Sequence, residues 1–198
     1  LRKSLPIAIG GMLWSPKRHT LPQPIEVTNE VVKLADKRYE AMSLKTAYLN
    51  KQFHQKDVFR NLYIETEQQI ETLQVSGLDN RSIEIITHLN IETWMNIKIE
   101  NWEIAHRLLT TYAIRHIENA NSPFSILLKC TSNEERELLR KHLIQRHIYP
   151  AILWTMPEDS PFDEAKVYAD TMLSVHCDAR YDSDNIVHIC KQIIGFYD

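Results

Sequence analysis

Hydrophobic and polar residues repeat with a helical period through the middle of the chain. Apolar positions recur every three or four residues, which is the spacing of one face of an α-helix. The pattern predicts helices over residues 28–49, 58–73, 81–89 and 91–117. Thr28 or Asn29 is expected to cap the first helix, and Asp79 to start the third. Gly77 is expected to end the second helix in a left-handed conformation.

From residue 122 onward, short β-type runs alternate with helical segments. The expected strands are FSILLKC, IYPAILW and LSVHC, and the expected helices cover residues 133–147, 162–172 and 184–196. Thr131 or Ser132 is expected to cap the first of these helices. The first strand, the helix after it and the second strand predict a right-handed crossover unit. Pro150 in the second strand favours an edge position or a strand start. This region therefore predicts a small α/β layer domain.

Residues 1–27 are extended in character and contain a glycine pair. Only 4 glycines occur in the chain, and Gly10 and Gly11 are two of them. Glycine permits a positive φ or a close backbone approach, so the pair indicates a special backbone position. An ordinary hairpin turn is the alternative.

Composition limits the classes of function. A chain of 198 residues that is 43% hydrophobic and 25% charged is typical of a soluble globular protein. The net charge of −3 gives no electrostatic reason to expect nucleic acid or an anionic membrane as partner. No apolar run reaches the roughly 20 residues of a membrane span. The three cysteines form no CxxC pair, which predicts reduced thiols in the cytoplasm.

The titratable side chains give few candidates for chemistry. The histidines of the helical region lack the ligand spacing of a zinc site, so no metal is expected: His88, His106 and His116. Cys177 follows His176, but neighbours in a strand point to opposite faces, which favours a buried structural thiol. Lys3 can act as a Schiff-base nucleophile only when it is neutral. By its residue chemistry alone, Lys3 is a solvated charge.

Several motifs occur along the chain in an order that resembles that of a known family. Six residues separate Lys3 from the glycine pair, and Lys98, Asn101 and Trp102 fit an R/K-x-x-N-[FYW]-x-x-L pattern with Ala105 in place of the leucine. FSILLKC, IYPAILW and LSVHCDARYDSD follow. This ordered set resembles the DegT-type sugar aminotransferases, which are pyridoxal-phosphate enzymes of fold type I.

The resemblance implies an α/β fold that is the C-terminal half of a fold type I transferase. Taken alone, this half would be α+β. On this reading residues 1–27 are the remnant of the cofactor-binding large domain, residues 28–121 a helical segment, and residues 122–198 a small α/β domain. Lys3 would bind pyridoxal 5'-phosphate as a Schiff base and then move a proton as general acid and base. The other cofactor-binding groups of the family precede the lysine, so this half alone is expected to be inactive.

The resemblance also implies substrates and partners. The expected reaction transfers an amino group from an amino-acid donor to a nucleotide-linked keto sugar for surface polysaccharide, in a cytoplasmic homodimer. The expected substrate contacts are Trp154, Asp178, Arg180 and Tyr181. Two alternatives stay open: a non-catalytic interaction module that binds a partner through apolar helical faces, and a decayed relative that keeps the fold without activity. The second alternative takes account of departures from the family pattern at Ala8, Ile9 and Leu153.

Overall fold

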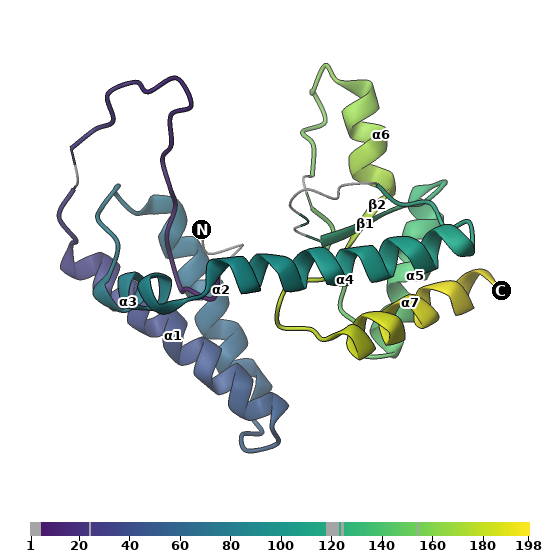
Figure 1. The fold of residues 1–198 in the computed structure, drawn as a ribbon, viewed down its shortest axis with the longest axis horizontal. Helices are drawn as coiled ribbons and strands as arrows, with labels where there is room; N and C mark the ends of the chain where they lie inside the picture. The colour runs from purple at the N-terminus through teal and green to yellow at the C-terminus, as the bar shows by residue number, and fades with distance from the viewer. Residues whose placement is uncertain (1–4, 24, 118–122, 124, 154) are drawn as a thin grey trace. The chain divides into compact units, whose positions relative to one another are not determined.

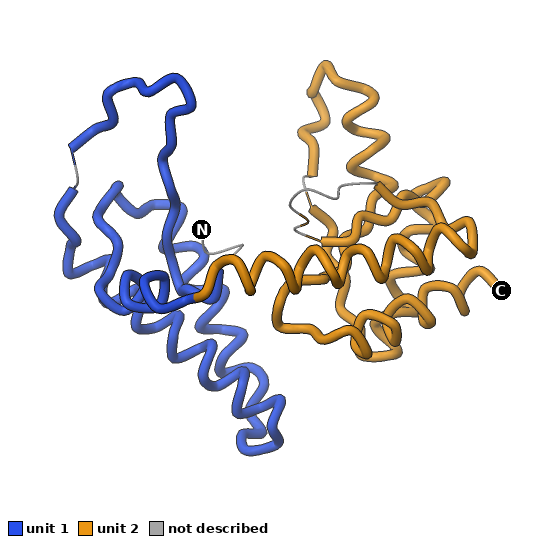
Figure 2. Tube along the Cα trace, viewed as in Figure 1, with its two compact units in different colours: residues 1–89 blue, residues 90–198 orange. Residues whose placement is uncertain are grey.

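The computed structural model describes residues 5–23, 25–117, 123, 125–153 and 155–198 (Figure 1). The helices and strands are α1 Asn29–Leu49, α2 Lys56–Thr72, α3 Asn80–His88, α4 Ile91–Thr111, β1 Ser125–Lys129, α5 Asn133–Gln145, α6 Asp163–Thr171, β2 Met172–His176 and α7 Ser183–Tyr197. The chain divides into two compact units, residues 1–89 and 90–198 (Figure 2). The mixture of helices with a small sheet agrees with the predicted class. The three-part division of the complete protein stays a prediction.

Unit 1 is built on the pair of helices α1 and α2, which lie side by side (Figure 1). Thr28 caps α1 as expected, since its hydroxyl accepts a hydrogen bond from the backbone N–H of Val31 at 3.3 Å. The core of this unit joins the apolar face of α1 to the segment before the glycine pair and contains Ala8, Ile9, Val31, Leu34, Ala35 and Tyr39. Arg38 is buried and donates from Nε to the carbonyl of Ala8 at 3.0 Å, which fixes that segment to the helix.

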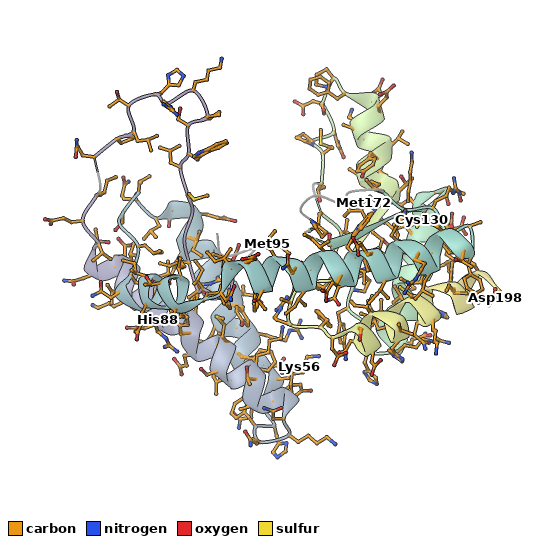
Figure 3. The ribbon with its side chains drawn as sticks, in the orientation of Figure 1. Lys56, His88, Met95, Cys130, Met172 and Asp198 are labelled. Carbon is orange, nitrogen blue, oxygen red and sulfur yellow. The ribbon has the colours of Figure 1, made fainter. Side chains whose placement is uncertain are left out.

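Unit 2 contains the two strands, which pair antiparallel with Ser125 opposite His176 and Lys129 opposite Met172. Helix α4 packs on α7 and β1, while α5 packs on α7, α6 and β2. Figure 3 labels Cys130 and Met172, which lie at one end of the two-stranded sheet. There the Cys130 N–H donates to the carbonyl of Thr171 at 2.9 Å. The core of unit 2 lies between the two-stranded sheet and helices α4, α5 and α7.

The predicted crossover unit is wrong. Residues 148–153 form no strand, and Ala151 bonds to β2 through reciprocal backbone hydrogen bonds of 2.8 and 2.9 Å with Ser174. Pro150 has no N–H to donate to a ladder, which limits pairing in this segment. The partner of β1 is β2 instead, and the pair is antiparallel.

One predicted helix end and one predicted capping residue are also wrong. Helix α4 ends at Thr111 rather than at 117, because Ala113 takes a positive φ of 55° and the chain turns toward β1. Helix α2 ends at Thr72, before Gly77, and among the described glycines only Gly10 has a positive φ. Gly77 instead allows its backbone to pass close to residues 25–27, since a Cβ there would lie 2.3 Å from the carbonyl oxygen of Ile25.

No helix in the described part of the chain is long and apolar enough to cross a bilayer.

Candidate functional site

A stripe of buried residues runs along one face of α4. Its members recur every three or four positions and are Lys98, Asn101, Trp102, Ala105 and Leu109. This spacing places them on one side of the helix. The last three belong to the apolar core of unit 2. Lys98 and Asn101 are polar, and a buried polar group normally has a hydrogen-bond partner, so the partners of Asn101 are informative.

The Asn101 side chain bonds to the loop that connects β2 to α7. Its Nδ2 lies 2.9 Å from the carbonyl oxygen of Tyr181, 3.3 Å from that of Cys177 and 3.4 Å from that of Asp178. One amide therefore satisfies carbonyls at both ends of a short, irregular segment. Because unpaired buried carbonyls are costly, this contact fixes the conformation of residues 177–181, which we call the anchored loop.

The anchored loop holds a charged pair. Arg180 donates from Nε and Nη2 to the two carboxylate oxygens of Asp178, each at 2.7 Å, and its backbone N–H donates to Oδ1 at 3.1 Å. Burial alone would raise the pKa of Asp178, but the hydrogen bonds and charge of Arg180 lower it below its usual range. His176 lies 3.9 Å away through Nδ1 and adds to this lowering. Asp178 is therefore a carboxylate at neutral pH.

The charged pair presents a cation at the surface. The Arg180 side chain is 58% exposed, whereas that of Asp178 is 15% exposed. Asp178 thus fixes the direction of a guanidinium that still faces solvent. A guanidinium stays protonated in proteins, so Arg180 can bind a carboxylate or phosphate group and does not act as a base.

Three of the predicted site residues are neighbours in sequence and lie in the same loop. Asp178, Arg180 and Tyr181 share the anchored loop, and burial raises the pKa of the Tyr181 hydroxyl. Lys3 and Trp154 lie outside the described residues. The contact that assembles the loop comes from Asn101, which sequence reasoning placed in a motif without giving it a role.

Cys177 is not a nucleophile in this arrangement. Its side chain is fully buried, and burial raises the pKa of the thiol to about 12, although the Lys98 ammonium opposes the shift. The thiol therefore stays protonated at neutral pH. This agrees with the expectation of a structural thiol.

A contact between two histidines was missed from the sequence. His106 Nδ1 lies 2.8 Å from His116 Nε2, His116 Nδ1 lies 2.9 Å from the carbonyl of Ile114, and Trp102 stacks on His106 at 4.8 Å between ring centroids. The turn after α4 brings the two rings together. The contact could not be predicted from the sequence because a continuous helix was predicted through residue 117. No group of three or more metal-binding side chains occurs within the described ranges.

The glycine pair forms a corner in unit 1. Gly10 has a φ of +132°, as the special-position interpretation expects, and no strand of a hairpin occurs among residues 5–23. Beside the pair lies a cavity of about 300 Å³. Its described lining is apolar apart from backbone, Gln74 and Ser76. A phosphate group requires cationic or multiple N–H donors. The described lining offers no cationic side chain, so these residues alone do not fit the phosphate of pyridoxal 5'-phosphate.

The comparisons with known proteins give little. No family model matches the sequence, and no curated protein matches it. Among solved structures, the chain is similar to the aminotransferase TlmJ from Streptoalloteichus hindustanus, with 10% sequence identity and a TM-score of 0.49. The match covers 62% of this chain and 38% of that one. The chain thus spans well under half of the length of TlmJ.

Proposed function

We propose that this chain is the C-terminal part of a pyridoxal-phosphate aminotransferase of the DegT type and fold type I. The complete protein transfers an amino group from an amino-acid donor to a nucleotide-linked keto sugar for surface polysaccharide. The ordered motifs of the sequence support this assignment. The three buried, unpaired thiols support a reducing cytoplasmic location.

One observation carries the proposal. The Asn101 motif and the DARY segment are separate parts of the family resemblance, and they are 76 to 80 residues apart in the chain. Nothing in local sequence requires them to meet. The hydrogen bonds from Asn101 to the anchored loop join them, and this contact supports the proposal that the loop, with Arg180 paired to Asp178, faces an anionic group of the substrate. A nucleotide-linked sugar carries such a group in its diphosphate, which a guanidinium binds in a bidentate manner.

The cofactor assignment depends on Lys3 and on groups outside this structure. Pyridoxal phosphate supplies an electron sink when it is bound, and the protein supplies orientation. The described lining of the cavity beside the glycine pair offers no cation for its phosphate, so we propose that the anchored loop contributes to positioning of the substrate. We propose that the family's usual homodimer completes the site.

The test is cofactor attachment in the full natural protein. Purified protein is incubated with pyridoxal 5'-phosphate, reduced with borohydride and digested, and the modified peptide is identified by mass spectrometry. We expect a yellow protein whose label lies on Lys3 and disappears in Lys3→Ala. Lys17→Ala is the matched control, because Lys17 is an exposed lysine near the same end of the chain. A colourless protein, or equal labelling of both variants, would contradict the proposal.

A second candidate function rests on a different observation. Met12, Leu13 and Trp14 are consecutive apolar side chains that are 74%, 66% and 72% exposed. Exposed apolar runs mark interaction sites, so the chain can alternatively be a non-catalytic module that binds a partner. This function predicts no cofactor attachment, and Lys3→Ala would behave like the wild type. A decayed relative would bind the cofactor without transferring an amino group, and an assay of the full protein separates that outcome.

A further inference from the structure

A second cavity in unit 1 has a different character. It measures about 410 Å³ and is lined by α1, the start of α3, Pro6 and Gln52. None of its residues belongs to the anchored loop or to the glycine corner. The wall combines apolar groups with one cation, Arg81.

The guanidinium of Arg81 lies over an aromatic ring. Its Cζ lies 3.9 Å from the centroid of the Tyr39 ring, which is a cation–π contact. Tyr39 is buried, and its hydroxyl lies 2.8 Å from Ser82 Oγ. Because core packing and this hydrogen bond fix the ring, they also restrict where the guanidinium lies above it.

The guanidinium keeps its hydrogen-bonding capacity. Arg81 forms no hydrogen bond and no ion pair with the described residues, and stacking uses only the face of the group. The N–H groups point outward from the edges of a guanidinium, so they remain available to a ligand. A flat, oriented fork of this kind matches the two oxygens of a carboxylate.

The rest of the lining is amphipathic. Met42, Ala47, Ile85 and Pro6 supply apolar surface. Thr46 donates its hydroxyl to the carbonyl of Met42 at 3.0 Å, which leaves its oxygen as an acceptor. Arg81 is the one cation among the described residues of the wall, and this described wall matches one negative charge better than two.

We propose that this cavity binds a small monocarboxylate with an apolar body, with Arg81 as the bidentate partner of the carboxylate and the α1–α3 wall in contact with the body. The proposal does not depend on the aminotransferase assignment, since it uses only residues of unit 1 whose positions are described. It concerns a ligand that the sequence motifs do not indicate.

The experiment titrates the ¹⁵N-labelled full chain with sodium benzoate and follows the Arg81 Nε–Hε signal by NMR. We expect saturable shifts at Arg81 and Ile85. Benzamide has the same aromatic body without the charge, and its affinity should be lower than that of benzoate by a factor of about ten or more. Inorganic phosphate tests charge without an apolar body and should also bind more weakly than benzoate. Equal binding of benzamide or of phosphate would overturn the proposal, and so would the absence of saturation.

Variants identify the residue responsible. Arg81→Gln should abolish the benzoate shifts at Ile85, and Arg81→Lys should weaken binding because an ammonium has no planar fork. Arg60→Gln is the matched control, since Arg60 is an exposed arginine of the same unit, paired with Asp57 at 3.8 Å. Each variant must retain the wild-type spectrum away from the cavity. If Arg60→Gln weakens binding as much as Arg81→Gln, the binding comes from general electrostatic attraction, and the proposed site is wrong.

Discussion

At the scale of single residues, Asn101 is the most informative side chain of unit 2. It is buried, and its amide is shared among three carbonyls of the anchored loop. A polar group in this position stabilises because its partners would otherwise be buried without a donor. The Lys98–Asn101–Trp102 motif therefore has a structural explanation: the asparagine holds a loop that is far away in the sequence.

Replacement of Asn101 measures this contribution. We expect Asn101→Ala to lower the free energy of unfolding by about 1–3 kcal/mol, because the freed carbonyls lose their donor. Asn96→Ala on the exposed side of the same helix is the control and should change it by less than about 0.5 kcal/mol. Urea unfolding followed by circular dichroism measures both. Equal effects would show that the contact with the loop contributes nothing.

The Asp178–Arg180 pair predicts a dependence on pH. Because the pKa of Asp178 is lowered in the folded state, the pair stabilises the protein above the ordinary carboxyl pKa of 3.8, and this stabilisation is lost as the pH falls through the lower folded pKa. Arg180→Gln should therefore be less stable than the wild type at neutral pH, and the difference should shrink below about pH 4. Thermal unfolding across pH measures the difference. A constant difference would contradict the explanation.

At the scale of elements, Gly77 joins two extended segments. Its N–H donates to the carbonyl of Glu26 at 3.2 Å, and Ser76 Oγ accepts from the N–H of Thr28 at 3.0 Å. The position requires the absence of a side chain, since an added Cβ would lie 2.3 Å from a backbone oxygen. The three nearest atoms all belong to the backbone of residues 25–27, so no flexible side-chain end can move aside.

We expect Gly77→Ala to destabilise unit 1 by about 1–3 kcal/mol through this overlap. Gly11→Ala is the control in the same unit, because nothing lies within 4 Å of a Cβ added there. Differential scanning calorimetry of the two variants gives the comparison. If Gly77→Ala unfolds at the wild-type temperature, residues 25–27 must be able to move away.

Helix starts could be predicted because their signals are local. Thr28, Asp79 and Ser132 each accept a hydrogen bond from the third residue after them, as cap chemistry requires. Strand partners could not be predicted in this way. Whether β1 pairs with residues 148–154 or 172–176 depends on tertiary packing, and both segments have the β-type composition of a strand.

At the scale of the whole molecule, the mixture of helices with a small sheet could be predicted, but the arrangement of the candidate site could not. Asp178, Arg180 and Tyr181 are neighbours in sequence, so their proximity requires no fold. Their attachment to α4 requires the packing of α4 on α7. The cavity beside Arg81 likewise forms only when α1 and α3 meet, and no local pattern marks it.

The positions of the cysteines provide a built-in reporter on half of the protein. Cys130, Cys177 and Cys190 are all buried, and all lie in unit 2. A thiol reagent therefore reacts only when unit 2 opens, whereas unfolding of unit 1 exposes nothing to it. The labelling rate of each cysteine, resolved by mass spectrometry of its peptide, follows one unit inside an intact chain. Asn101→Ala should accelerate labelling, and Gly77→Ala should not, if the two units open independently.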